Sequence, residues 1–330
     1  MWTEAFRIPF LDIPVYSYGL LMVIGFLAGT QLMKLLAKRS GVDADFFVNA
    51  ALVALITGVI GARLSHVLEN FSTYTDASRS VWANFSDAAN IRAGGLTYYG
   101  GFLFAAPCVV AYAFWKKMPI RHVADIVAPA LMIGLAFGRI GCFMNGCCYG
   151  ATCQLPWAVH FPYYSNTYID QFDAGKLTPP AELLVDTDRG PKLIQPMQFK
   201  SKPLLREVAN HSHANGVHPA QLYSAFTAFL LAGVLVALFT IPHAQGSLFM
   251  LMLMLEGSSR FVLELLRAEP AVADTTWGGM SISMFISLGL VLTGVVGWFI
   301  IRRFKQDRRV MTYDSMNVEK HHARALAQRT

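Results

Sequence analysis

The sequence predicts an all-α integral membrane protein with seven transmembrane helices, an external N-terminus, a cytoplasmic C-terminus and an extracytoplasmic loop subdomain. Two observations lead to this fold class. Hydrophobic residues make up 54% and charged residues 15% of the 330 residues, against about 45–50% and about 25% in soluble domains. Apolar runs of about 20 residues, the length that crosses a bilayer, also recur along the chain. Both observations argue against a soluble cytosolic enzyme.

Seven windows of near-continuous apolarity define the expected helices. They cover residues 18–36, 46–67, 99–115, 123–143, 221–240, 246–266 and 280–301. The first window is expected to be retained rather than cleaved as a signal peptide. The residues before it include Glu4 and Asp12 besides Arg7 and lack a basic leader, and no small-residue cleavage site follows.

Basic residues set the expected orientation, because Lys and Arg in short loops favour the cytoplasmic side. They follow the first, third and seventh windows, which places all three groups on one side: Lys34, Lys38 and Arg39; Lys116, Lys117 and Arg121; Arg302, Arg303, Lys305, Arg308 and Arg309. The net charge of +6 is then mostly a cytoplasmic tail that meets anionic membrane lipid. Nucleic acid is not an expected partner.

The predicted organisation is a transmembrane domain over residues 1–301, with an extracytoplasmic insertion at 145–220, and a flexible basic tail over 302–330. The insertion mixes Pro, Asp and Lys with aromatic residues such as Trp157, Phe161 and Tyr163, which indicates partial order or contact with the membrane surface. Loops of this length tend to be functional or disordered. No internal repeat is visible, which weakens a transporter built from inverted halves.

Three arginines fall inside the apolar windows, where ionisable groups are costly and usually mark a site. Arg63, Arg139 and Arg260 all lie toward the predicted outer ends of their helices, so they converge on one leaflet. Arg63 taken alone is equally explained by a side chain that reaches the headgroups from a helix end. Arg139 stands between Gly138 and Gly141, and glycines allow a backbone or a ligand to come close.

Arg260 shares one helix face with Glu256, Glu264 and Arg267, at steps of four, four and three residues. One interpretation is a salt-bridge ladder that only packs helices. The other is an anion site whose guanidiniums are held by Glu264, because arginine suits bidentate recognition of phosphate.

Two loops at the predicted outer side carry further polar groups. In Gly94-Gly95-Leu96-Thr97-Tyr98-Tyr99-Gly100-Gly101, backbone amides could bind an anion while a phenol points into the site; an ordinary turn and helix start would explain it equally well. His218-Pro219-Ala220-Gln221-Leu222-Tyr223 supplies an imidazole, an amide and a phenol. His218 could also serve only as a cap.

Of the five cysteines, Cys108 lies mid-window and is expected to pack there. Structural disulfides are the favoured interpretation for Cys142, Cys147, Cys148 and Cys153, which follow the fourth window in a compartment expected to be oxidising. Metal ligation is weaker, because this spacing fits no usual finger or iron–sulfur cluster. The sequence therefore predicts no metal and no cofactor. No Ser-His-Asp, P-loop or Rossmann signature stands out.

Taken in order, four motifs resemble those of the bacterial prolipoprotein diacylglyceryl transferase family: the glycine-flanked tyrosine loop at 94–101, Gly138-Arg139-Ile140-Gly141-Cys142-Phe143-Met144-Asn145-Gly146, the stretch from His218 to Tyr223, and Arg260 to Arg267. Residues 18–20 and 61–63 also resemble its first two helices, so the resemblance runs from about 18 to 301. It implies a multi-pass enzyme of the bacterial inner membrane that transfers diacylglyceryl from phosphatidylglycerol to the lipobox cysteine of a preprolipoprotein signal peptide and releases glycerol phosphate.

The resemblance also implies roles for individual residues. Arg139 resembles the arginine that holds the lipid phosphate, and Arg260 a second essential arginine. Further substrate-site positions are Tyr18, Arg63, Asn145, Gly150, His218, Gln221, Tyr223 and Glu264. Two positions depart from the family pattern: Tyr99 stands where many members have a histidine proposed as base, and Cys142 where many have asparagine.

Tyr99 leaves three possibilities open, because a phenol with a pKa near 10 is a poor base at neutral pH. It is activated by neighbouring charges, the base lies elsewhere, or the residue only positions substrate. A strong base is not required, since a free thiol is already partly thiolate at pH 7. Two other functions compete: a lipid-binding transporter or flippase, and a thiol–disulfide oxidoreductase using Cys147 and Cys148. The nearly uncharged inner halves of the helices disfavour the first, and the absence of a C-x-x-C pair disfavours the second.

Overall fold

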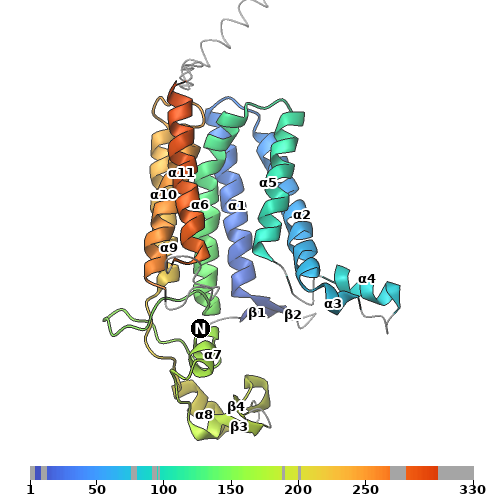
Figure 1. Cartoon of the computed structure of the whole chain (residues 1–330), viewed down its shortest axis with the longest axis vertical. Coiled ribbons are helices and arrows are strands. Elements are labelled where there is room, and N and C mark those ends of the chain that lie inside the picture. Colours follow the sequence, from blue (N-terminus) through green and yellow to red (C-terminus); the bar gives the residue numbers. More distant parts are fainter. Residues whose placement is uncertain are drawn as a thin grey trace, which may run out of the picture. The chain divides into compact units, whose positions relative to one another are not determined.

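The computed structural model describes residues 4–8, 13–75, 80–90, 95, 97–187, 190–199, 202–267 and 280–303 (Figure 1). Within this part of the chain, a long helix occupies each of the seven predicted windows. These are α1 (Ser17–Arg39), α2 (Ala44–Glu69), α5 (Tyr98–Trp115), α6 (Ile120–Asn145), α9 (Ala220–Phe239), α10 (Ser247–Leu265) and α11 (Ile282–Arg303). The predicted basic tail lies outside the described residues from 304 onward.

Five of these helices, α1, α2, α6, α9 and α11, are long and apolar enough to cross a membrane among the residues described. The apolar stretch of α5, Tyr99–Trp115, is shorter. In α10, the face that carries Glu256, Arg260 and Glu264 lowers the apolarity of the helix. The described chain is therefore a mainly helical protein with five candidate membrane spans, consistent with an integral membrane protein.

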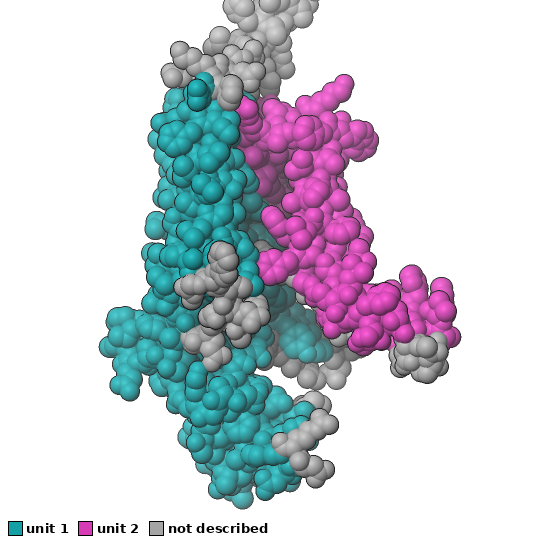
Figure 2. All heavy atoms as spheres, viewed as in Figure 1, with its two compact units in different colours: residues 1–29, 128–308 teal, residues 30–127, 309–330 magenta. Residues whose placement is uncertain are grey.

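The chain divides into two compact units (Figure 2). Unit 1 comprises Met1–Gly29 and Ala128–Arg308, and unit 2 comprises Thr30–Val127 and Arg309–Thr330. Both α1 and α6 continue from one unit into the other. Most of the predicted site residues belong to unit 1.

Glycines allow the helices of unit 1 to pack closely. A Cβ on Gly257 of α10 would lie 2.8 Å from the carbonyl oxygen of Ser287, and one on Gly294 of α11 would lie 2.8 Å from that of Met250. Such close approach of backbones is how helices associate where lipid removes the hydrophobic drive. A core shared by α6, α9 and α10 completes the packing: Ala128, Met132, Leu231, Ala232, Leu235, Leu248 and Met252.

Unit 2 is built on the contact between α2 and α5. A Cβ on Gly61 would lie 2.7 Å from the carbonyl oxygen of Gly100, and one on Gly100 would lie 2.8 Å from that of Gly61. The glycine pair that the sequence suggested as a close-approach loop therefore has a packing function at the start of α5. Two short helices, α3 (Phe71–Tyr74) and α4 (Val81–Ala89), follow α2.

The insertion between α6 and α9 is folded and has its own small core. It contains α7 (Asn166–Asp173), a hairpin of β3 (Leu184–Thr187) and β4 (Gly190–Leu193), α8 (Pro203–His211) and two 3₁₀ turns, Ala181–Leu183 and Pro196–Phe199. One core cluster consists of Phe161, Tyr168, Ala214 and Val217, and a second contains Leu183 and Ala209. This hairpin and a second one, β1 (Glu4–Ile8) with β2 (Ile13–Tyr16), are elements that the all-α prediction does not contain.

Two glycines of α11 offer a matched test of the α10–α11 contact. We expect Gly294→Ala to destabilise the protein by about 1–3 kcal/mol, the usual cost of overpacking, because its Cβ would meet backbone atoms of α10. Gly289 has nothing within 4 Å of its Cβ position, so Gly289→Ala should be neutral or slightly stabilising. Thermal unfolding in detergent measures both; equal melting temperatures for the two variants would contradict this packing.

Candidate active site

The predicted site residues divide between the two units. Unit 1 contains Tyr18, Arg139, Asn145, Gly150, His218, Gln221, Tyr223, Arg260 and Glu264, whereas unit 2 contains Arg63 and Tyr99. Each group has its own local geometry.

Three backbone hydrogen bonds assemble the site in unit 1. The amide of Gly150 donates to the carbonyl of His218 at 2.9 Å. The amide of His218 donates to the carbonyl of Ala151 at 3.0 Å. The amide of Ala151 donates to the carbonyl of Leu266 at 2.8 Å. These bonds, the backbone clasp, join the segment after α6 to the segment before α9 and to the end of α10.

Gly150 is at the centre of the backbone clasp for a steric reason. A Cβ there would lie 2.6 Å from the Cβ of His218 and 2.9 Å from the carbonyl oxygen of Leu266. Real Cβ atoms do not occupy such positions, so glycine at position 150 allows the three backbone segments of the clasp to approach one another. The contribution of Gly150 that the structure shows is therefore to backbone geometry.

Gly146 reverses the chain at the end of α6. Its φ of +70° is in the left-handed region, where glycine commonly terminates helices. Its carbonyl accepts hydrogen bonds from the Thr167 hydroxyl at 2.7 Å and from the Thr167 amide at 3.2 Å. The turn folds residues 147 and 148 back beside the last turn of α6.

Arg139 and Arg260 share one acidic neighbour. Both guanidiniums act on the charge of Glu256, which lies one helical turn before Arg260 on α10. The Nε of Arg260 donates to the Ser283 hydroxyl at 3.1 Å. Among the residues described, neither arginine has a salt bridge within 4.0 Å, and the Nη atoms of Arg260 have no hydrogen-bond partner. Two basic side chains and one acidic side chain therefore influence one another here, an excess of positive groups that suits an anion.

Of the two arginines on its predicted helix face, Arg260 and Arg267, Glu264 forms an ion pair with Arg267. Its Oε2 accepts a hydrogen bond from Nη1 of Arg267 at 3.3 Å, and its Oε1 accepts one from the Ser281 hydroxyl at 3.1 Å. Glu264 is buried and fixes the end of α10 to the start of α11. The face of α10 thus contains both a structural ion pair and a separate group around Glu256.

His218, Gln221 and Tyr223 are positioned by partners from distant segments. The Tyr223 hydroxyl accepts a hydrogen bond from Nε1 of Trp157 at 2.8 Å and lies 3.4 Å from Nδ1 of His218. Nε2 of Gln221 donates to the carbonyl of Cys147 at 2.8 Å. Trp157 is a contributor that sequence reasoning missed as a site residue, because it is 66 positions from Tyr223.

Tyr18 lies on α6. A Cβ on Gly141 would be 2.9 Å from Cδ2 of Tyr18, so the ring rests on the glycine that follows Arg139 by two positions. The first half of α1 and the second half of α6 approach elsewhere too, since a Cβ on Gly25 would lie 2.8 Å from that of Phe137. The motif glycine therefore makes room for an aromatic ring.

In unit 2, Arg63 is buried and its guanidinium binds backbone carbonyls. Nε and Nη2 donate to the carbonyls of Ala88 and Asp87, both at 2.8 Å, and Nη1 donates to that of Gly95 at 3.1 Å. These contacts tie α4 and the glycine loop to α2. Tyr99, in the first turn of α5, is 55% exposed. Within the predicted anion loop, Gly94 and Leu96 lie outside the described residues, as does the side chain of Tyr98.

His66 is a second residue that the sequence analysis did not single out. A Cβ on Gly95 would overlap the His66 imidazole, so this ring from α2 lies directly against the glycine loop. Asn70 Nδ2 is 3.4 Å from its Nδ1. No local motif marks His66, because the contact joins positions 29 residues apart.

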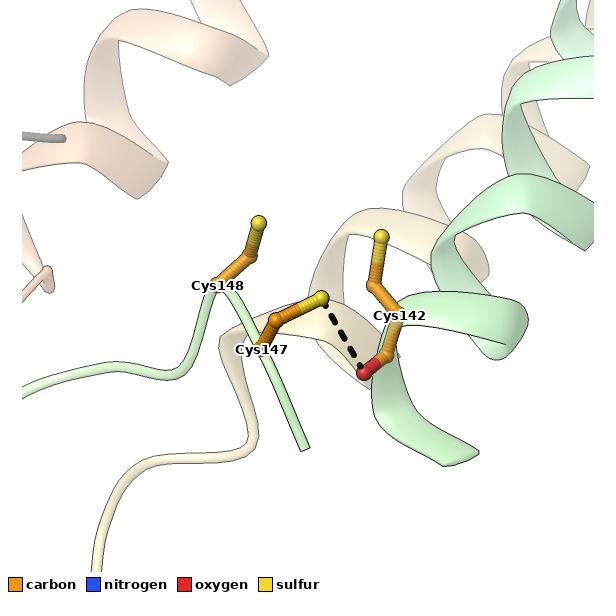
Figure 3. A group of neighbouring side chains, drawn as sticks. All are labelled: Cys142, Cys147 and Cys148. Atoms are coloured by element: carbon orange, nitrogen blue, oxygen red, sulfur yellow. Dashed lines mark hydrogen bonds between the residues drawn. The ribbon is translucent and has the colours of Figure 1, made fainter. Parts of the chain in front are cut away.

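The prediction of disulfides is wrong for this structure: all five cysteines are free. Instead, the sulfur atoms of Cys142, Cys147 and Cys148 lie within 4.8 Å of one another (Figure 3). The Cys147 thiol points toward the helix end and donates to the carbonyl of Cys142 at 3.7 Å. We refer to these three residues as the thiol cluster. The sequence spacing concealed it, because the turn at Gly146 is what brings the thiols together.

Neighbouring groups favour the thiolate of Cys148. Hydrogen bonds from the thiols of Cys142 and Cys147 lower the pKa of the Cys148 thiol, and the guanidiniums of Arg139 and Arg267 act in the same direction. Asn145, the last residue of α6, stands two positions before Cys147. The thiol cluster is therefore close enough to Arg139, one of the two arginines that act on Glu256, for their charges to interact.

Comparison with known proteins relates the whole chain to one family. A family model described as prolipoprotein diacylglyceryl transferase matches residues 4–300. Relatives named phosphatidylglycerol–prolipoprotein diacylglyceryl transferase include one from Rhodopirellula baltica, 28% identical over 323 residues, which cover 92% of this chain and 60% of that relative. One from Clostridium tetani is 27% identical over 293 residues, covering 89% of this chain and 95% of the relative. One from Bacillus cereus is 27% identical, covering 91% and 92%.

Gly150→Ala tests the backbone clasp. We expect it to destabilise unit 1 by about 1–3 kcal/mol, because the added methyl group would meet the carbonyl of Leu266 and the Cβ of His218. Gly233→Ala in α9 is the matched control, since nothing lies within 4 Å of its Cβ position. Thermal unfolding in detergent measures both variants. A Gly150→Ala protein as stable as the control would show that the clasp is not close-packed.

Proposed function

The chain belongs to the prolipoprotein diacylglyceryl transferase family, and from this membership we propose that it transfers the diacylglyceryl group of phosphatidylglycerol to a prolipoprotein. It is a membrane-embedded transferase of lipoprotein biosynthesis. The observation that carries this function is the family match over residues 4–300. The acceptor is the lipobox cysteine of a preprolipoprotein signal peptide, the other product is glycerol phosphate, and the setting is the bacterial inner membrane.

We propose seven spans, with α5 and α10 added to the five candidates. The 18 residues of α5 extend about 27 Å at 1.5 Å per residue, close to the hydrocarbon thickness of about 30 Å. The charges of α10 are inward-facing site groups, which are the usual exception to apolarity in a span. With seven spans, the basic ends of α1 and α11 share the cytoplasmic side. The N-terminus and the 145–220 insertion are then external, within one transmembrane domain over 1–301.

Arg139 and Arg260 support binding of the lipid phosphate. Both guanidiniums act on the charge of Glu256, so two basic side chains outnumber one acidic side chain in this group, which favours an anionic ligand. The Nη atoms of Arg260 have no partner among the described residues, and a guanidinium with available donors suits phosphate. The lipid phosphate therefore binds between these arginines.

The remaining site residues divide into groups that line the site and groups that position others. Tyr18 and Tyr223 present phenols beside the arginine-bearing helix and the His218 loop, and Asn145 borders the thiol cluster. Gly150, Gln221 and Glu264 fix the backbone and the helix ends. In unit 2, Arg63 positions the glycine loop by binding the carbonyl of Gly95.

The reaction is a nucleophilic displacement at carbon. The substrate thiolate attacks the carbon of the diacylglyceryl group that is bonded to a phosphate oxygen; a carbon–sulfur bond forms there and the bond from that carbon to the phosphate oxygen breaks. The electron pair of the broken bond stays on glycerol phosphate, so negative charge grows there in the transition state. Guanidiniums aimed at that charge supply the main catalysis.

Arg139→Ala and Arg260→Ala should each reduce transfer by at least about 100-fold, because each removes a donor aimed at the developing charge. The assay incubates purified protein in detergent with phosphatidylglycerol and a lipobox peptide bearing one cysteine, and measures the diacylglyceryl mass gain. Arg206→Ala, an exposed arginine of α8, is the control and should retain full transfer. Near-normal activity of the Arg139 variant would overturn the phosphate assignment.

Tyr99→Phe should reduce transfer only partly, by less than about tenfold, whereas loss of a general base typically costs about 100-fold or more. The reason is that a free thiol is already partly thiolate at neutral pH, so the reaction does not depend on a strong base. The same mass-shift assay, run over a series of peptide concentrations, separates kcat from KM. Abolished transfer would show that the phenol takes part in the chemical step.

A further inference from the structure

The thiol cluster has the dimensions of a metal site. A zinc ion binds thiolates at about 2.3 Å, which places two sulfurs of one tetrahedral site about 3.8 Å apart. The three sulfurs already lie within 4.8 Å of one another. Cys142 stands on the last turn of α6, and Cys147 and Cys148 stand on the loop that follows (Figure 3). A shift of about 1 Å, within reach of small rotations of cysteine side chains, closes this distance.

The positive charges around the thiol cluster suit a zinc–thiolate complex. Three thiolates and one Zn²⁺ together have a net charge of −1, so the complex as a whole is an anion. The guanidiniums of Arg139 and Arg267 lie near enough to act on the charge of Cys148. They would repel a bare divalent ion but stabilise this anionic complex.

Other contacts hold the ligands in place, as outer-shell groups do in metal sites. The Cys147 thiol donates to the carbonyl of Cys142, and Nε2 of Gln221 donates to the carbonyl of Cys147. Gln221 is fully buried, and its Oε1 has no hydrogen-bond partner among the described residues. That oxygen is an available acceptor for a donor brought in by a bound group. Cys148 itself has a φ of +60°, a backbone conformation rarely adopted by non-glycine residues.

We propose that Cys142, Cys147 and Cys148 bind one Zn²⁺ with three sulfur ligands, and that the fourth position binds the thiol of the acceptor cysteine. This inference rests on the proposed function, since that function supplies a thiol substrate. Zinc sites with three protein ligands keep one position for water or substrate. A thiol that coordinates such an ion is deprotonated.

The step balances without a further reactant. The acceptor thiol replaces a water molecule on zinc and releases its proton to solvent, giving a zinc-bound thiolate. The sulfur then attacks the phosphate-bearing carbon of the diacylglyceryl group, the bond from that carbon to the phosphate oxygen breaks, and glycerol phosphate leaves with the electron pair. The thioether product is uncharged and a weaker ligand than the thiolate, so it dissociates and water returns. No electrons are gained or lost by the metal.

This arrangement explains how Tyr99 can stand where many family members have a histidine. Deprotonation by zinc supplies the thiolate that a base would otherwise generate. A free thiol with a pKa of about 8.5 is only about 0.3% thiolate at pH 6 but about three-quarters thiolate at pH 9. The advantage of zinc should therefore be large at low pH and small at high pH.

The first experiment measures binding on the full-length protein in detergent. The protein is stripped with a chelator and reloaded with ZnCl₂; zinc is counted by mass spectrometry and free thiols by alkylation. We expect one zinc per chain and protection of three of the five cysteines. Cys142→Ser, Cys147→Ser and Cys148→Ser should each weaken zinc binding at least about tenfold, whereas Cys108→Ser and Cys153→Ser should not.

Size-exclusion profiles identify any variant that fails to fold, and Cys→Ala replacements then repeat the test. Equal zinc binding by the cluster and control variants would overturn the proposal, as would a disulfide within the cluster.

The second experiment compares transfer by stripped and zinc-loaded protein at pH 6 and pH 9 in the peptide mass-shift assay. We expect zinc to accelerate transfer about 100-fold at pH 6 and less than about tenfold at pH 9. Equal transfer by both forms at both pH values would overturn thiol activation and leave the transferase function standing. A zinc-loaded protein that never shifts the peptide mass would overturn the proposed function itself, and thiol activation with it.

Discussion

The geometry of unit 1 depends on the backbone clasp centred on Gly150. Its amide and that of Ala151 bind the carbonyls of His218 and Leu266, so the ends of three helices are fixed at one place. Arg139 lies near the end of α6, Tyr223 near the start of α9 and Arg260 in the second half of α10. Main-chain hydrogen bonds hold these helix ends so closely that no methyl group fits at Gly150. An electrostatic site requires side chains that are fixed in place in this way.

Arginines within the apolar helices have different partners in the two units. Arg63 binds three carbonyls and is buried, so its donors are used for structure. Arg139 has no salt bridge among the described residues and acts only by charge on Glu256 and Cys148. The two arginines therefore differ in their surroundings: the donors of Arg63 bind backbone carbonyls, whereas Arg139 has no ion pair among the described residues.

The motif residues combine packing with chemistry. Gly61 and Gly100 bring α2 and α5 into backbone contact, and Gly141 accommodates the ring of Tyr18. The insertion adds Trp157, whose indole fixes the hydroxyl of Tyr223. Cys142, Cys147 and Cys148 extend the site at its edge next to Arg139, where thiol chemistry and phosphate binding can act on the same substrates. The helices and the insertion of unit 1 thus both contribute residues to this group.

The sequence by itself determined the seven long helices, because apolar run length and backbone hydrogen bonding act within each segment. It also indicated the arginines, whose charge is conspicuous in an apolar window, and the family, whose motifs occur in order. Only the tertiary structure decided the partners: Glu264 with Arg267, Glu256 with the two arginines, and three free thiols in one cluster. Glu264 has Arg260 four residues before it and Arg267 three residues after it, so the spacing along the helix permits an ion pair with either arginine. The positive φ of Gly146 and the contacts between distant segments select one of them, and neither can be read from a local pattern.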